Sequence, residues 1–224
     1  MTCLWCFNEN THTISWTTMF VVRTSVTLCT NCEQMLQKIR DERCRKCCKW
    51  TTKAVCADCK WWEQMEDPLT YNHSVFTYNH FMQAVITKWK YRGDYMLGEM
   101  FRHAFYKEFQ DQFKCSQQTP AIVPIPLSDG RLAERKFNQA AQLAQFLTKD
   151  YEQLLMRTDS EKQAKKTRRQ RIFTKNPFKL VKPIHKPVVL VDDIYTTGTT
   201  LRHAASILKQ HGCPSVYGYT LVRG

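Results

Sequence analysis

Two adjacent aspartates followed by a hydroxyl-rich turn are the residues of this 224-residue chain best suited to hold a ligand. Asp192 and Asp193 come directly after residues 188–191, a continuous apolar run that predicts a strand buried on both faces. Apolar residues at helical spacing follow from Leu201 onward. Between strand and helix stand Thr196, Thr197, Gly198, Thr199 and Thr200. This order lets backbone N–H groups and hydroxyls converge on an anion at a helix N-terminus.

A sugar phosphate fits this combination, because carboxylates accept hydrogen bonds from vicinal ribose hydroxyls while the turn holds a phosphate. A Walker loop is excluded, since no lysine stands between Lys186 and Lys209. The plainer alternative, a helix cap and a tight loop, leaves the carboxylate pair unexplained. The stretch resembles the signature of type I phosphoribosyltransferases, which bind phosphoribosyl pyrophosphate (PRPP). That resemblance puts Asp192 and Asp193 on the ribose hydroxyls and residues 196–200 around the 5-phosphate.

Eight of the eleven cysteines form four Cys-x-x-Cys pairs before residue 60, which is the spacing of metal ligands in a reducing compartment. Two such pairs complete one tetrahedral site, so four pairs predict two structural zinc ions. The sequential partition groups Cys3, Cys6, Cys29 and Cys32 on one ion and Cys44, Cys47, Cys56 and Cys59 on the other. A cross-braced partition is the alternative. Zinc would act as a staple, because about sixty residues build too small a core to fold unaided.

The rest of the chain alternates strands and helices. A polar joint at residues 63–68 predicts a boundary between a zinc-binding module, residues 1–64, and a larger domain, residues 65–224. Helical stripes are expected over 81–89 and 97–113, a buried strand over 121–124, another helix over 137–147 and a last strand over 215–222. The predicted fold class is α/β, a parallel sheet of the phosphoribosyltransferase type flanked by helices and preceded by a cysteine-rich module.

A second loop is expected beside the threonine turn, because ligands of parallel sheets sit at the carboxyl ends of the strands. In phosphoribosyltransferases the loop after an early strand faces the pyrophosphate of PRPP. By this resemblance Ser128, Asp129, Arg131 and Arg135 occupy a comparable place. Solvated residues opening a helix are the alternative reading of the two arginines.

The net charge of +13 favours polyanionic ligands or partners. Residues 162–186 hold ten lysines and arginines and no acidic residue, which predicts a loop that closes over a pyrophosphate or follows a nucleic-acid backbone. A solubilising surface is the plainer alternative. The candidate nucleic-acid contacts are Lys165, Lys166, Arg168, Arg169 and Arg171. The absence of a long apolar run or a secretory signal predicts a soluble cytoplasmic protein without membrane insertion.

The motifs together are more specific than any one of them. Besides the cysteine pairs and the Val-Asp-Asp-Ile-Tyr-Thr-Thr-Gly-Thr-Thr stretch, the chain has Lys-Trp-Lys-Tyr-Arg-Gly-Asp at 88–94, Val-Pro-Ile-Pro-Leu-Ser at 123–128 and Arg-Lys-Phe-Asn-Gln-Ala at 135–140. The whole chain resembles the ComF family, most closely its ComFC branch of late competence proteins. This implies a role in DNA uptake during natural transformation, with single-stranded DNA and a ComFA-type helicase-like ATPase as partners. Lys136 stands where relatives usually have glycine.

Catalytic activity is left open by the sequence. Many purine phosphoribosyltransferases carry an acid inside the turn as a base for the nucleobase, whereas this chain has Thr196 there, as orotate-type members do. The sequence is therefore compatible with three functions: a competence protein with a ribose-phosphate pocket, an active phosphoribosyltransferase of nucleotide metabolism, and a zinc-dependent scaffold with a vestigial pocket. PRPP is the expected ligand, and Mg²⁺ held by its pyrophosphate and hydroxyls is the expected companion.

Overall fold

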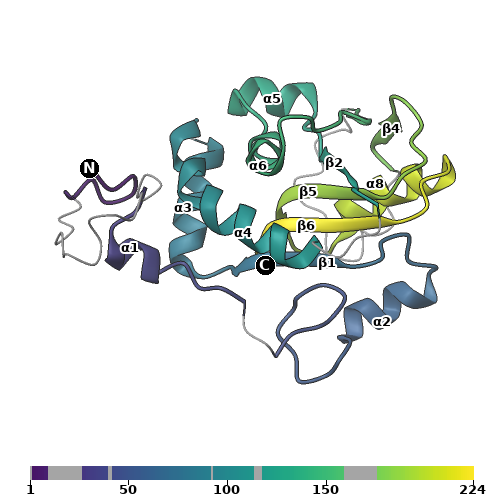
Figure 1. The fold of residues 1–224 in the computed structure, drawn as a ribbon, viewed down its shortest axis with the longest axis horizontal. Coiled ribbons are helices and arrows are strands. Elements are labelled where there is room, and N and C mark those ends of the chain that lie inside the picture. The colour runs from purple at the N-terminus through teal and green to yellow at the C-terminus, as the bar shows by residue number, and fades with distance from the viewer. Residues whose placement is uncertain (1, 10–26, 40–41, 92, 114–117, 159–175) are drawn as a thin grey trace.

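A four-stranded parallel sheet forms the centre of the computed structural model, which describes residues 2–9, 27–39, 42–91, 93–113, 118–158 and 176–224 (Figure 1). The strands are β1 (Asn72–Thr77), β2 (Ala121–Pro124), β5 (Val188–Tyr195) and β6 (Val216–Arg223), in the order β1-β6-β5-β2. Every neighbouring pair is parallel, as the alternation of strands and helices predicts.

Helices cover both faces of this sheet. They are α3 (His80–Tyr91), the 3₁₀ helix η1 (Tyr95–Phe101), α4 (Arg102–Phe113), α5 (Asp129–Arg135), α6 (Gln139–Leu147) and α8 (Thr199–Gln210). Val189 and Val191 of β5 belong to one core cluster, with α3, η1 and α4, while Val188 and Leu190 belong to another, with α8. Because successive side chains of a strand point to opposite faces, the apolar run 188–191 can fill both clusters.

A small antiparallel ribbon lies beside α8. It pairs β3 (Leu155–Arg157) with β4 (Phe178–Leu180), and the Asn176 side-chain amide donates to the His203 carbonyl oxygen of α8 at 2.7 Å. The chain between these two strands, residues 158–177, includes most of the basic run 162–186. Its five candidate DNA contacts, Lys165, Lys166, Arg168, Arg169 and Arg171, lie outside the described residues.

The cysteine-rich N-terminal part contains α1 (Thr30–Gln34) and α2 (Ala57–Gln64), and its two cysteine groups pack in different places. The first group packs in the core cluster of α3, where the Trp5 ring meets the Phe81 ring edge-on at 5.3 Å. The second group shares its cluster with α8 and Leu69. The two groups are therefore held by separate surfaces of the sheet domain, and the boundary near residue 65 stays a prediction.

The segment between the cysteine groups, together with the first cysteine pair of the second group, covers the outer edge of β1. The Ile39 N–H donates to the Val75 carbonyl at 3.1 Å, the Thr77 N–H donates to the Gln37 carbonyl at 2.9 Å, and the Asn72 N–H donates to the Lys46 carbonyl at 2.8 Å. Backbone groups that would face solvent on an edge strand are thereby paired. In the described part of the chain, no helix has both the length and the apolar character needed to cross a membrane.

Candidate functional site

The predicted strand, turn and helix are all present, but the strand is longer than the apolar run suggests. Strand β5 continues through Asp192 and Asp193 to Tyr195, because β6 pairs with it as far as Tyr195 and Arg223. Residues 196–198 form the turn, and α8 starts at Thr199. The two carboxylates are thus mounted on a rigid strand and not on a loop.

Lys90, at the end of α3, forms an ion pair with Asp193, and the two side chains are only 12% and 11% exposed. Asp192 has no such counter-ion at contact distance among the described residues. Burial, reinforced by the negative charge of Asp193, raises the pKa of Asp192 to about 7. At neutral pH the pair therefore combines a carboxylate neutralised by Lys90 with a carboxyl group poised to lose its proton.

Lys90 was not among the predicted site residues. The only sequence signal for it is the Lys-Trp-Lys-Tyr-Arg-Gly-Asp motif at 88–94, in which a lysine stands at the end of an amphipathic helix. Its contact with Asp193 is a tertiary one, and no local pattern predicts it.

The turn after β5 exposes hydroxyls and N–H groups at the beginning of α8. The Thr197 and Thr199 hydroxyl oxygens lie 2.9 Å apart, so they form a hydrogen bond. Gly198 caps the helix with φ of +77° and has no side chain to accept a capping hydrogen bond, while the Thr199 N–H makes a long hydrogen bond of 3.5 Å to the Thr197 hydroxyl. An anion can fill that role because a helix N-terminus presents unsatisfied N–H donors.

A buried arginine on α8 holds this turn in place. The Arg202 guanidinium donates to both carboxylate oxygens of Asp67, at 3.0 and 2.8 Å, and to the Tyr195 hydroxyl at 2.6 Å. It also stacks over the Trp62 ring at 4.4 Å, and it fills the space where a side chain on Gly198 would be. Trp62 and Asp67 belong to α2 and the joint that follows it. The Arg202 guanidinium therefore connects the second cysteine module to the turn.

The Trp62 ring is thus part of a packed contact with Arg202, whereas the Trp50 side chain is 71% exposed.

The second predicted loop follows β2, whose partner β5 runs parallel to it; the Ile125 N–H donates to the Val191 carbonyl at 2.9 Å. Both candidate loops therefore leave the same edge of the sheet, as expected. Ser128 is buried at the N-cap position of α5, where its side chain makes no capping hydrogen bond, while Asp129 and Arg131 are exposed. Their contact with the pyrophosphate of PRPP stays a prediction.

Arg135 is better placed for an anion than Arg131. Its Nη1 donates to the Gln139 Oε1 at 3.3 Å, yet the buried Arg135 Nε and Gln139 Nε2 have no hydrogen-bond partner. Two neighbouring buried donors without an acceptor suit a phosphate oxygen, since unpaired buried donors are costly. Gln139 is a second residue that the sequence reasoning missed, although it stands in the quoted motif 135–140.

Lys136 ends α5 with φ of +69°. This left-handed conformation favours glycine, and a lysine adopts it here. The lysine keeps the local geometry at some backbone cost.

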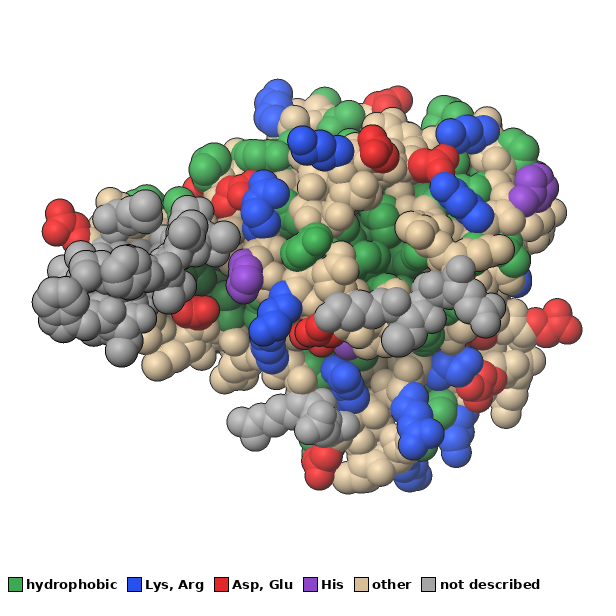
Figure 2. Space-filling view, viewed as in Figure 1, with side chains coloured by type: hydrophobic (Ala, Val, Ile, Leu, Met, Phe, Trp, Pro, Cys, Tyr) green, Lys and Arg blue, Asp and Glu red, His purple; other side chains and the backbone are tan. Residues whose placement is uncertain are grey.

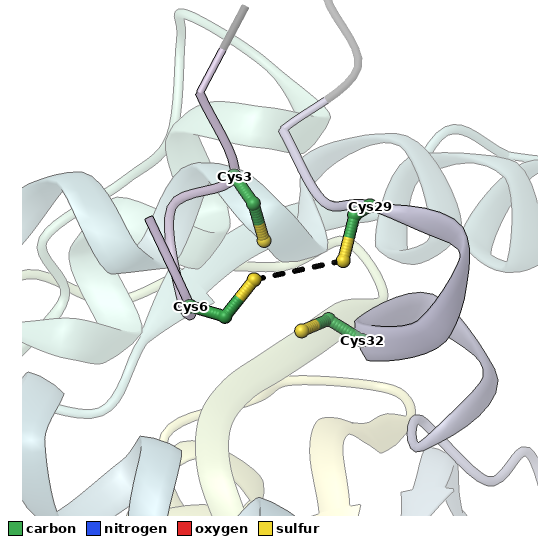
Figure 3. Close-up of side chains that lie close together, drawn as sticks. All are labelled: Cys3, Cys6, Cys29 and Cys32. Atoms are coloured by element: carbon green, nitrogen blue, oxygen red, sulfur yellow. Dashed lines mark hydrogen bonds between the residues drawn. The ribbon is translucent and has the colours of Figure 1, made fainter. Parts of the chain in front are cut away.

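The cysteines form two groups that can each hold a metal ion, and the sequential partition is confirmed. In each group, Cys3/Cys6/Cys29/Cys32 and Cys44/Cys47/Cys56/Cys59, all four sulfur atoms lie within 4.8 Å of one another. Figure 3 shows the first four side chains turned toward a common centre, with the Cys6 and Cys29 Sγ atoms 3.7 Å apart. Zinc–sulfur bonds of about 2.3 Å at a tetrahedral ion separate the sulfurs by about 3.8 Å. The geometry therefore fits zinc.

The second group is the more buried one. Its Cys47 and Cys56 sulfurs are also 3.7 Å apart, and the Cys56 N–H donates to the Cys44 sulfur at 3.3 Å. N–H···S contacts of this kind suit metal-bound thiolates, and four cysteine ligands leave no open coordination position for catalysis.

Comparison with known proteins identifies the class of domain that carries the acid pair and the threonine turn. Residues 137–224 match the family model of the phosphoribosyl transferase domain, which includes β5, the threonine turn and α8. The fold and the site thus define a phosphoribosyltransferase-type domain carrying an N-terminal cysteine-rich module. Over 99% of its length the chain is 34% identical to the competence protein ComFC of Bacillus subtilis, of which it covers 94%. It is 31% identical to ComFC of Streptococcus pneumoniae over the full length of both chains. The chain belongs to the ComFC family.

A shorter match is to the DNA utilization protein YhgH of Escherichia coli O157:H7, which is 32% identical over 46% of this chain and 48% of that protein.

Proposed function

We propose that this protein acts in the uptake of DNA during natural transformation. The observation that carries the proposal is the similarity along the whole chain to two proteins named for competence, with a further match to one named for DNA utilization. The net charge of +13 supports a polyanionic partner. Deleting the gene in a transformable host and supplying it again should abolish and then restore the transformation frequency. An unchanged frequency in the deletion strain would reject the role.

The partners that we propose are single-stranded DNA and a ComFA-type ATPase. Support for the first comes from the run of ten basic residues within 162–186. Replacing Lys165, Lys166, Arg168 and Arg169 together by alanine should weaken binding of a labelled oligothymidylate and flatten the dependence of the affinity on salt. An unchanged salt dependence would place the DNA elsewhere. Co-purification with the ATPase tests the second partner.

The sugar-phosphate site is proposed to bind PRPP. Ionised Asp192 and Asp193 would accept hydrogen bonds from the two ribose hydroxyls, and the turn at residues 196–200 would surround the 5-phosphate. We assign Lys90 and Arg135 to the pyrophosphate, because Lys90 lies against Asp193 and the buried Arg135 Nε and Gln139 Nε2 have no hydrogen-bond partner. Mg²⁺ bound to the pyrophosphate and the ribose hydroxyls would reduce the remaining negative charge.

Calorimetric titration of PRPP, with and without Mg²⁺, tests this site. Asp192→Asn/Asp193→Asn should abolish binding, because an amide accepts less strongly than a carboxylate and its NH₂ group donates where an acceptor is required. Asp150→Asn, which changes an exposed acid after α6, is the matched control and should bind as the wild type does. Equal affinities of the wild type and the double variant would overturn the assignment.

An active phosphoribosyltransferase is the second candidate function. It is favoured by the acid pair, the turn and the Lys90 cation standing together at the sheet edge. Such an enzyme breaks the bond between C1 of the ribose and pyrophosphate, and an incoming nucleophile takes its place. Thr196 supplies no base, so the nucleophile would have to arrive deprotonated or lose its proton to another group. PRPP-dependent release of pyrophosphate with a panel of nucleobases and amines supports this function; no release with any of them rejects it.

A further inference from the structure

A cavity of about 330 Å³ lies apart from the sugar-phosphate site, between the second cysteine module, the start of β1 and the end of α4. The residues of interest in its lining are Arg43, Arg45, Cys48, Tyr71, His73 and Gln112. None of them belongs to the acid pair, the threonine turn or the loop after β2. Figure 2 shows Lys and Arg side chains gathered over the part of the surface where Figure 1 places α2 and the loop before it.

Two positive charges at this cavity have no acidic partner in the part of the chain that the structure describes. Among the described residues, neither Arg43 nor Arg45 has a carboxylate within ion-pair distance. The lysines of the same module differ: Lys49 Nζ lies 2.9 Å from Asp58, and Lys46 Nζ lies 3.6 Å from Glu63. Within the described residues, Arg43 and Arg45 are therefore the cations around Cys44 and Cys47 that lack an acidic partner and can bind an anion.

The carboxylate that contacts His73 within the described residues belongs to Glu108, and it has two partners. His73 Nε2–H donates a hydrogen bond to the Glu108 carboxylate at 3.1 Å, and the other oxygen of this carboxylate lies 3.8 Å from Lys38 Nζ. Burial and the nearby Arg43 charge lower the pKa of His73, so its ring is neutral at physiological pH. Among the described residues, no acid that lines the cavity competes for the two arginine charges.

The remaining lining groups are neutral hydrogen-bonding groups. Burial raises the pKa of Tyr71, which keeps its hydroxyl protonated, and a hydrogen bond links this side chain to Gln112. Burial likewise raises the pKa of the Cys48 thiol, so this side chain lines the cavity as an uncharged group and not as a nucleophile.

We propose that this cavity binds the phosphate group of a nucleotide or of a nucleic-acid strand, held by the Arg43 and Arg45 guanidinium groups. Planar guanidinium forks match the oxygens of a phosphate, and they do so better than ammonium groups. A volume of about 330 Å³ is close to the lower limit of small-molecule sites, so it leaves room for more than the phosphate itself.

The chain segment around Cys44 gives this site a fixed geometry and a neighbouring aromatic ring. Cys44, a ligand of the second metal group, stands between the two arginines in the chain and is fully buried. Arg43 also forms an antiparallel bridge with Trp50, whose side chain is 71% exposed. A base attached to the bound phosphate could stack on that ring.

The test compares two variants that remove the same charge from the same knuckle. Arg43→Ala/Arg45→Ala removes the two free charges, whereas Lys46→Ala/Lys49→Ala removes two paired ones and is the matched control. Zinc content and the thermal midpoint establish that each variant is folded. The probes are adenosine monophosphate in calorimetry and a fluorescein-labelled oligothymidylate in anisotropy.

For at least one probe, we expect the arginine variant to lose tenfold or more in affinity and the lysine variant to lose less than twofold. Binding of the mononucleotide identifies a free phosphate ester as the ligand; binding of the oligonucleotide alone identifies the strand. With the strand, losing two phosphate contacts should reduce the slope of log affinity against log salt by about 1.4. Equal losses in the two variants, or no binding of either probe to the wild type, overturn the proposal.

The PRPP site is separated from this one by a third variant. Asp192→Asn/Asp193→Asn should leave the arginine-dependent binding unchanged, so a failure of the PRPP assignment does not affect this result. If that variant loses the same binding, the phosphate sits at the threonine turn and the cavity proposal is rejected.

Discussion

Asp67→Asn tests the buried ion pair that joins the second cysteine module to α8. The Arg202 guanidinium donates two hydrogen bonds to this carboxylate, at 3.0 and 2.8 Å, and the two side chains are 3% and 5% exposed. An asparagine of the same size accepts only one of these bonds and turns an NH₂ group toward the cation. The substitution therefore leaves a buried charge without its counter-ion.

Removing one partner of a buried ion pair costs about 3–5 kcal/mol. Arg202 keeps its bond to the Tyr195 hydroxyl at 2.6 Å and its stacking on Trp62, so we expect the lower end, about 3 kcal/mol. In a chain of this size each kcal/mol lowers the thermal midpoint by about 2–4 °C. The expected fall is about 6–12 °C.

Thermal unfolding of the zinc-loaded full chain measures this effect. Glu63→Gln is the matched control, because Glu63 pairs with Lys46 at 3.6 Å while 43% exposed, and such surface pairs contribute about 0–1 kcal/mol. Asp67→Asn/Arg202→Met should recover part of the loss, since no unpaired charge remains. A loss below about 1 kcal/mol in Asp67→Asn, or a double variant worse than the sum of the single ones, would refute the reasoning.

Three further predictions concern the metal groups, the turn and the acid pair. Elemental analysis should find two zinc ions per chain and one in Cys56→Ser, whose thermal midpoint falls because the closed site stabilises the fold; two ions in that variant would contradict the assignment. Gly198→Ala should weaken PRPP binding and destabilise the chain, because its Cβ would overlap Arg202 and Tyr195 and its φ is +77°; wild-type affinity and stability would contradict this. With its pKa raised to about 7, Asp192 holds a proton that the unfolded chain releases near pH 4, so stability falls as pH rises from about 4 through about 7. In denaturant titrations, the free energy of unfolding should fall less in Asp192→Asn than in the wild type when the pH is raised from about 5 to about 8. An equal fall in the two proteins would contradict the raised pKa of Asp192.

The elements that position the site could be predicted because their signals are local. An apolar run, a threonine turn and a helical stripe at residues 188–208 define strand, turn and helix without reference to the rest of the chain. The cysteine spacing likewise predicts two metal groups. The strand end was harder to predict, because Asp192 and Asp193 are poor strand formers that pairing with β6 keeps extended.

The contacts that tune the site could not be predicted, since each joins residues far apart in the chain. Lys90 reaches Asp193 from α3, and Asp67 reaches Arg202 across the domain. A sequence contains the charges but not the distances between them. The choice between the two cysteine partitions was open for the same reason, and the structure settles it through the positions of the sulfur atoms.

The backbone pairing between the cysteine-rich segment and β1 has a consequence for solubility. Residues 37–39 and Lys46 occupy the hydrogen-bonding groups on the outer edge of β1; residues 37–39 lie between the two metal groups in the chain, and Lys46 lies between Cys44 and Cys47 of the second group. A bare strand edge is a template on which another chain can add a strand, and the residues of β1 are almost all buried, with Val75 and Phe76 as its apolar side chains. Loss of zinc should release these residues and expose the edge of β1. We therefore expect the metal-free protein to aggregate through this edge before the sheet itself unfolds.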